Sequence, residues 1–276
     1  MRRYITFLVF TTLILFAVTG CQIIQTTPAV GASEAIDPAI SAHILRSTVR
    51  IQIVAPLLDE HGRRHYLSEN GQNSPLNAIS RGLGTIVSSG EGNLIITTDH
   101  FDQLKAPIGE ITITGSNDRE IMLSLESFRS LIRYEDNFII IFNAPPELPH
   151  GALPGDGDQV YPGSTVQIVH RHPDNGAISV IPALVDAWID YHGIPSFQLQ
   201  NLNGDLIVPG NSGGGVWHNG RPVGSIHRTI LVDESGQTLK STATPGSPSH
   251  LSYATRLSPV RMPMLHQGVP IAEITK

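Results

Sequence analysis

The chain has 276 residues, of which 40% are apolar, and this is enough for a proper core in one large domain or two small ones. Its formal net charge is −6 and it has no basic run, so nothing in the composition calls for a nucleic-acid partner. The 20 prolines and 26 glycines disfavour long helices, and many short Val/Ile/Thr runs between turn residues indicate β structure.

The amino terminus has the pattern of an export signal. Met1-Arg2-Arg3 precedes an apolar run from Tyr4 to Val18 that is too short to span a bilayer comfortably. Val18-Thr19-Gly20-Cys21 then ends on the only cysteine and resembles the lipobox of bacterial lipoproteins. The resemblance implies a lipoprotein signal peptide over 1–20 and a lipidated Cys21 that holds the protein on a membrane of the bacterial cell envelope, outside the cytoplasm. An uncleaved anchor and an ordinary secretory cut are the alternatives.

The segment after Cys21 is predicted to be a membrane tether, over residues 21–42. With the cysteine lipidated, no thiol remains for a disulfide, a nucleophile or a metal site. The globular domain is predicted over 43–258, and an alternating strand from Ser47 to Val54 opens it. The polar segment from Leu57 to Ser80 has no period and is predicted to be a surface loop.

The first half of the domain, about 43–144, contains a candidate general base. Gly82–Val87 and Leu94–Thr98 flank a turn and predict a β-hairpin. The second of these runs leads into Asp99 and His100. His100 differs from most of the other histidines because an apolar strand aims it, with a hydrogen-bonded core histidine as the alternative.

A candidate carboxylate follows later in the same half, after short predicted strands at Ile111–Thr114 and Ile121–Leu125. Asp136 comes just before the apolar run Phe138–Phe142, which is typical of a strand buried on both faces. At the mouth of such a strand, Asp136 is placed to accept a hydrogen bond from a histidine N–H. A simple strand-capping role is the alternative, and Glu135 is a rival for the same function.

A connection rich in proline and glycine, about 144–163, separates this half from a second one at about 164–258. The second half repeats the β character, and a final segment, 259–276, is predicted to be a C-terminal tail. The predicted strands of the second half are 165–169, 178–181, 183–189, 196–200, a hairpin of 215–218 with 221–226, and 251–255. His170 and His172 have no third ligand at useful spacing, so no metal and no cofactor are predicted.

A candidate nucleophile lies in Gly210-Asn211-Ser212-Gly213-Gly214. A serine hydroxyl needs a base to remove its proton and N–H groups to receive the charge of the tetrahedral intermediate. Glycines around Ser212 allow its N–H and that of Gly210 to turn toward one point, as an oxyanion hole requires. The alternative is a glycine-rich turn between two strands.

Together, Thr97-Thr98-Asp99-His100, Asp136-Asn137-Phe138-Ile139-Ile140 and the Ser212 motif resemble the trypsin/chymotrypsin-like serine proteases, and most closely their bacterial heat-shock-protease branch. The resemblance implies two six-stranded antiparallel β-barrels with the active site between them, in an all-β chain. It also implies roles: His100 as general base, Asp136 as the group that orients it, and Ser212 as the nucleophile that attacks polypeptide substrates. The connection at 144–163 falls where this fold needs its linker.

The chain departs from the family pattern at a few positions. Thr98-Asp99 replaces small residues before the histidine, Phe138 replaces alanine, and Gly215 replaces a proline or alanine. Asn211 carries no charge, so it cannot pair with an amino terminus made by zymogen cleavage. The resemblance places Leu206 at the base of the specificity pocket, which predicts cleavage after small or medium apolar residues, although Asp205 is adjacent.

Two other functions fit parts of the sequence. The Ser212 motif also fits the nucleophile elbow of α/β-hydrolases, which would make the protein an esterase with Asp233 and either His250 or His266. That fold needs helices between its strands, and the segment after Ser212 has no helical period. The other alternative is a lipoprotein that keeps the protease fold, without catalysis, as a binding or sensing module.

Overall fold

The computed structural model describes residues 36–69, 72–89, 92–98, 109–123, 132–134, 139–172, 175–191, 193–203, 207, 210–230 and 251–258. The predicted signal peptide with Cys21, and the candidate residues His100, Asp136 and Leu206, lie outside these ranges. None of the described segments forms a helix that is long and apolar enough to cross a membrane.

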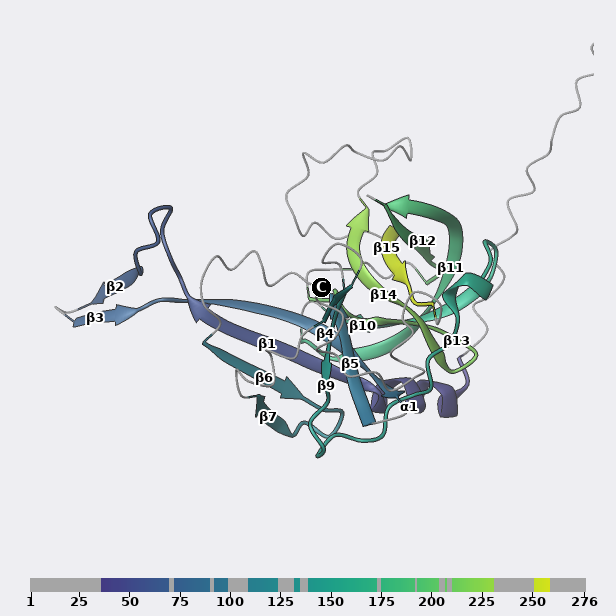
Figure 1. Ribbon diagram of the computed structural model, residues 1–276, viewed down its shortest axis with the longest axis horizontal. Coiled ribbons are helices and arrows are strands. Elements are labelled where there is room, and N and C mark those ends of the chain that lie inside the picture. Colours follow the sequence, from purple (N-terminus) through teal and green to yellow (C-terminus); the bar gives the residue numbers. More distant parts are fainter. Residues whose placement is uncertain are drawn as a thin grey trace, which may run out of the picture. The chain divides into compact units, whose positions relative to one another are not determined.

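Almost every described element is a β-strand, which confirms the all-β prediction (Figure 1). The elements are α1 (Pro38–Arg46), β1 (Thr48–Pro56), β2 (Tyr66–Glu69), β3 (Gln72–Pro75), β4 (Asn77–Ser89), β5 (Gly92–Thr98), β6 (Glu110–Thr114), β7 (Glu120–Leu123), β8 (Ile132–Tyr134), β9 (Ile139–Asn143), a 3₁₀ turn (Gly157–Gln159), β10 (Thr165–Arg171), β11 (Ile178–Tyr191), β12 (Ile194–Asn201), β13 (Gly215–His218), β14 (Arg221–Ile230) and β15 (Leu251–Arg256).

Apart from β2 and β3, the strands of the first half form one antiparallel sheet in the order β7-β6-β1-β4-β5-β9-β8. The described part of this half therefore carries seven strands in its main sheet, where the family resemblance implies six. Its core is aliphatic apart from Phe142 and is built by alternation: Val49, Ile51 and Ile53 of β1 point inward and are almost fully buried. The β4–β5 hairpin is paired from Ser89 opposite Gly92 inward, as the sequence predicts.

The strands of the second half close into a barrel in the order β10-β11-β12-β15-β14-β13. The β13–β14 hairpin turns at Asn219 and Gly220, whose φ angles of 51° and 71° are those of a two-residue hairpin turn, so this predicted hairpin is confirmed. Strand β11 runs unbroken through Pro182, although the sequence suggests two strands there. The Pro182 carbonyl accepts from the Leu202 N–H at 3.1 Å, so proline still uses the one main-chain hydrogen-bonding group it has.

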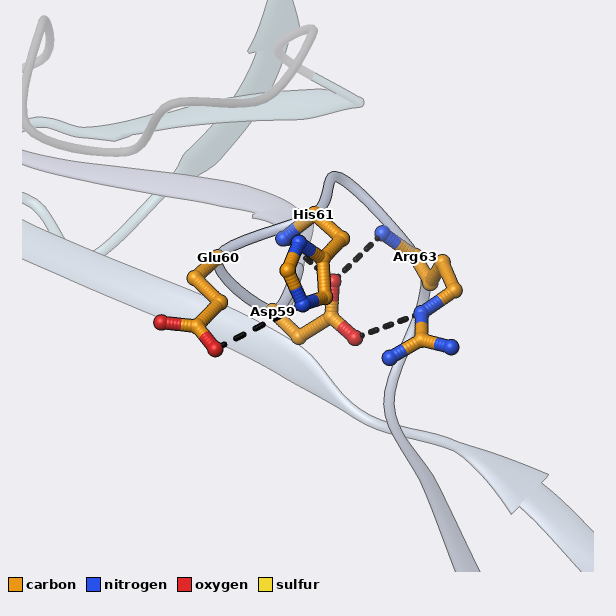
Figure 2. Close-up of polar contacts among 4 residues, drawn as sticks. All are labelled: Asp59, Glu60, His61 and Arg63. Atoms are coloured by element: carbon orange, nitrogen blue, oxygen red, sulfur yellow. Dashed lines mark hydrogen bonds and ion pairs between the residues drawn. The ribbon is translucent and has the colours of Figure 1, made fainter.

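The polar segment after β1 is exposed, as predicted, but it is not one irregular loop. Strands β2 and β3 form a small hairpin, and β4 already begins at Asn77. Figure 2 shows the turn before β2, where one Asp59 carboxylate oxygen accepts from the N–H groups of His61 and Arg63, both at 2.8 Å. The other oxygen accepts from Arg63 Nε at 2.8 Å, so this side chain reinforces a turn that backbone hydrogen bonds of Asp59 with Arg63 and Gly62 also close.

The two halves share a small apolar cluster, here called the shared core: Ile44, Leu83, Ala152, Val169 and Trp217. Its members come from α1, β4, the connection between the halves, β10 and β13. The helix begins on an N-cap, since Asp37 accepts from the Ala39 N–H at 2.7 Å, and it places His43 edge-on against Trp217 with ring centroids 5.9 Å apart. Contacts of α1 thus reach the second half as well as the first.

Candidate active site

The loop around Ser212, residues 210–214 and here called the serine loop, is fixed at its carboxyl end by strand β14. The Gly213 N–H donates to the Ile226 carbonyl at 2.7 Å, and the Ile226 N–H donates to the Gly214 carbonyl at 2.9 Å. The Gly214 N–H closes the loop on the Asn211 carbonyl at 3.0 Å. Ser212 is half-buried, while Asn211, Gly213 and Gly214 around it are buried.

Strand β4 holds the same loop from the other half of the chain. The Leu83 N–H donates to the Ser212 carbonyl at 2.8 Å. The Leu83 carbonyl in turn accepts from Thr97 Oγ1 at 2.6 Å, and Thr97 is buried near the end of β5. One residue of β4 therefore ties the candidate nucleophile to the strand that leads into His100.

A second residue makes the same connection. The Ile226 carbonyl accepts from Thr98 Oγ1 at 2.7 Å as well as from the Gly213 N–H. The residue after Ser212 and the residue two before His100 therefore lie within two hydrogen-bond lengths of each other. Thr98 replaces a small residue of the family pattern, and this bond gives it a structural role.

Glycine is required at two positions of this region by close packing. Gly213 has φ +85°, and a Cβ there would overlap the Leu83 carbonyl oxygen and Thr97 Oγ1. A Cβ at Gly215 would overlap the indole nitrogen of Trp217 and lie 2.6 Å from Thr85 Oγ1. The departure from the family pattern at Gly215 is thus explained by the buried tryptophan two residues later.

Asn211, directly before Ser212, is fully buried. Its Oδ1 accepts from the Arg171 backbone N–H at the end of β10, at 2.5 Å. This hydrogen bond between neutral groups anchors the serine loop to the barrel.

Of the predicted site residues, Gly210 and Ser212 lie in the described chain, while His100, Asp136 and Leu206 do not. The N–H groups of Gly210 and Ser212 donate to no other described residue. Donors left uncommitted in this way are what an oxyanion hole requires. The triad itself stays a prediction.

Sequence reasoning missed the supporting residues of the loop. Leu83 and Ile226 act through their main chains, so no side-chain pattern marks them. Arg171 lies beside the loop, with its Nη1 3.0 Å from the position that a Cβ of Gly210 would take. Its only sequence signal is its place between two histidines, two residues after the predicted strand 165–169.

Several solved structures have an architecture similar to that of this chain. The chain is similar to the HtrA-type protease AlgW with a decapeptide, at 17% identity and TM-score 0.51, with 78% of this chain and 62% of that chain covered. A variant of AlgW with a decapeptide gives 17% identity and TM-score 0.53, over 79% and 61% of the two chains. The active form of the Rv3671c protease from M. tuberculosis gives 16% and 0.51, over 83% and 85%.

The structural similarity covers only part of the AlgW chains and is not accompanied by a match to a family model or a curated sequence. The chain spans less than two thirds of the length of the two AlgW structures. No protein-family model matches it, and no curated protein sequence matches it significantly. At 16–17% identity the likeness shows the fold, and this chain therefore has the fold of the HtrA-type, trypsin-like serine proteases.

Proposed function

We propose that this protein is a serine endopeptidase that hydrolyses peptide bonds through His100, Asp136 and Ser212. The observation that carries the proposal is the shared acceptor at Ile226, which brings Gly213 and Thr98 together in a serine-protease fold. Two extended residues span at most about 7 Å, so the two-residue spacing after Thr98 is short enough to allow the proposed contact of His100 with Ser212.

The strand register supports Asp136 as the third member. Thr98, the last residue of β5, pairs with Ile139, the first residue of β9, and Ile139 also pairs with Tyr134 of β8. The chain therefore leaves β5, enters β9 and leaves β8 at one end of this sheet. Asp136 lies two residues after Tyr134 in sequence, and His100 lies two after Thr98.

In the proposed mechanism, His100 removes the proton from the Ser212 hydroxyl as that oxygen attacks the substrate carbonyl. Asp136 accepts a hydrogen bond from the other ring nitrogen, which fixes the tautomer and stabilises the imidazolium. The N–H groups of Gly210 and Ser212 receive the charge of the carbonyl oxygen. His100 then donates its proton to the leaving amine, and water hydrolyses the acyl-enzyme by the same steps.

The test uses the full chain in detergent with a fluorophosphonate probe, which labels only an activated serine. We expect labelling of the wild type, loss of labelling in Ser212→Ala, and a fall of several orders of magnitude in peptide hydrolysis. Ser225→Ala is the matched control, because Ser225 is buried in the strand that holds the loop. A folded wild type that does not label would favour the noncatalytic binding module instead.

The same assay separates the rival carboxylates. Asp136→Asn is expected to lose most of its turnover, because the histidine loses the partner that fixes its tautomer. Glu135→Gln is the matched control and should keep it. The reverse result would assign the orienting role to Glu135.

The esterase alternative does not fit the fold. Every pairing between the described strands is antiparallel, and one nine-residue helix is described. An α/β-hydrolase requires a mostly parallel sheet with helices between its strands.

Substrate preference and anchoring are proposed from the sequence. With Leu206 at the base of the pocket, we propose cleavage after small or medium apolar residues, and a peptide library with a firm preference for lysine or arginine would reject this. We also propose that a lipid on Cys21 holds the enzyme on the envelope membrane. The Cys21→Ser variant cannot carry this lipid and should move from the membrane fraction to the soluble fraction.

A further inference from the structure

A cavity of about 290 Å³ lies beside the serine loop, between the first sheet and the end of β10. Gly82 lines it, and the neighbouring Leu83 is the residue that donates to the Ser212 carbonyl. Arg171 lines it from the opposite half, and the same guanidinium lies against Gly210. Two lining residues, Gly82 and Arg171, therefore adjoin the loop that carries the candidate nucleophile.

The cavity wall is strongly charged. Its ionisable residues are Arg50, Arg81, Arg171, Asp118 and Glu120. Three arginines against two carboxylates leave a positive balance. The Arg50 guanidinium is already paired with the Asp118 carboxylate, which is 82% exposed.

The other two arginines have no carboxylate partner among the described residues. Arg81 Nε donates to Gln52 Oε1 at 3.0 Å, which leaves its two terminal nitrogens without a described acceptor. The Arg171 guanidinium donates no hydrogen bond to a described residue. Arg171 is half-buried, so its charge is less screened by water than that of an exposed side chain.

We propose that this cavity is a substrate subsite that selects a carboxylate side chain, from aspartate or glutamate, close to the scissile bond. The inference rests on the proposed function. Guanidinium groups bind carboxylates through paired, charge-assisted hydrogen bonds, and a partly enclosed site makes these bonds stronger than on an open surface. Arg171 and Arg81 are the two groups that bind the substrate carboxylate, and Arg50 is occupied by Asp118.

The first experiment measures binding, so that it does not depend on catalysis. Full-length Ser212→Ala protein is titrated with labelled, carboxyl-amidated peptides that differ only by glutamate or glutamine, placed in turn at each of three positions before and after an apolar residue. We expect glutamate to strengthen binding about tenfold at one position, which identifies the side of the scissile bond. Equal affinity of the glutamate and glutamine peptides at every position would overturn the proposal.

The second experiment assigns the preference to the cavity. Arg81→Gln and Arg171→Gln are each expected to reduce the glutamate-over-glutamine ratio, and Arg81→Glu should favour a lysine peptide instead. Arg221→Gln, an exposed arginine outside the cavity, is the control and should leave the ratio unchanged. A ratio that survives both cavity variants places the selective group elsewhere and overturns the assignment.

These outcomes are independent of the proposed catalysis. If the protein labels with fluorophosphonate but shows no glutamate preference, the proposed protease function stands and the proposed subsite is rejected. A protein that does not label but binds glutamate peptides through Arg81 and Arg171 keeps the subsite as that of a peptide-binding module.

Discussion

Gly213 is the residue on which the serine loop depends most. It combines a positive φ with contacts that leave no space for a methyl group. Both features follow from the close approach of the loop to Leu83 and Thr97, which belong to the other half of the chain. The sequence motif marks the glycine, but its partners are distant in sequence and interact largely through main-chain atoms, so the motif does not reveal them.

Gly213→Ala is expected to destabilise the protein by more than the positive φ alone can explain. A non-glycine residue at positive φ costs about 1–2 kcal/mol, and here the Leu83 strand must also shift. Gly220→Ala is the matched control, since Gly220 has φ +71° with no atom within 4 Å of its would-be Cβ. Urea unfolding of both variants measures the difference, and equal losses would contradict the packing argument.

At the scale of elements, the end of β5 is tied down by two threonine hydroxyls rather than by apolar packing alone. Strand periodicity correctly predicted this hairpin and the β13–β14 hairpin, because alternation and turn residues are local signals. It failed for β2 and β3, whose exposed strands have no apolar face. The sequence analysis also predicts no helix at α1. The Asp37-Pro38 start is a valid helix signal, but it lies in a segment that resembles a tether.

Thr97→Val should reduce turnover more than it reduces stability. The hydroxyl bond to Leu83 is lost at a cost of about 1–2 kcal/mol, and the segment before the proposed base, His100, loses one of its two anchors. Thr112→Val is the control, because Thr112 is on β6 of the same sheet and its hydroxyl contacts only the side chain of Glu110, at 3.4 Å. Peptide hydrolysis and thermal unfolding are measured on both variants. A loss of turnover in Thr97→Val no larger than its loss of stability explains would argue against a role in positioning.

The turn before β2 is expected to weaken in acid. Hydrogen bonds, chiefly from the Arg63 backbone N–H, hold the pKa of Asp59 below its ordinary value of 3.8 (Figure 2). A lowered carboxyl pKa stabilises the folded turn fully above that value, and the stabilisation is lost as the pH falls through the lower, folded pKa. The backbone amide chemical shifts of His61 and Arg63 should change with pH as Asp59 titrates, and this pH dependence should be absent in Asp59→Asn. A midpoint above 3.8 would contradict the assignment.

At the scale of the whole molecule, the shared core joins an open sheet to a closed barrel. Trp217 is its largest member and is fully buried, with α1 covering it through His43. The fold class followed from the composition and from the family resemblance. The shared core could not be predicted, because its members lie far apart in sequence and none belongs to a motif.

Ile44→Ala is expected to cost about 2–5 kcal/mol, because it removes a fully buried side chain from between the halves. It should also shift the fluorescence of Trp217 to the red, which is measured in a Trp188→Phe background. Ile79→Ala is the control, since Ile79 is 51% exposed on β4. An unchanged emission maximum with an intact stability would show that α1 does not cover the indole.

The double use of the Ile226 carbonyl limits how this site can be switched. A rearrangement that displaces Gly213 must either carry the end of β5 along or break two hydrogen bonds on one oxygen. Residues 211 and 212 are held by other bonds, since the Asn211 and Ser212 carbonyls accept from the N–H groups of Gly214 and Leu83. Any change between competent and incompetent arrangements of this loop therefore involves both halves of the chain, because Ile226 belongs to one half and Thr98 to the other.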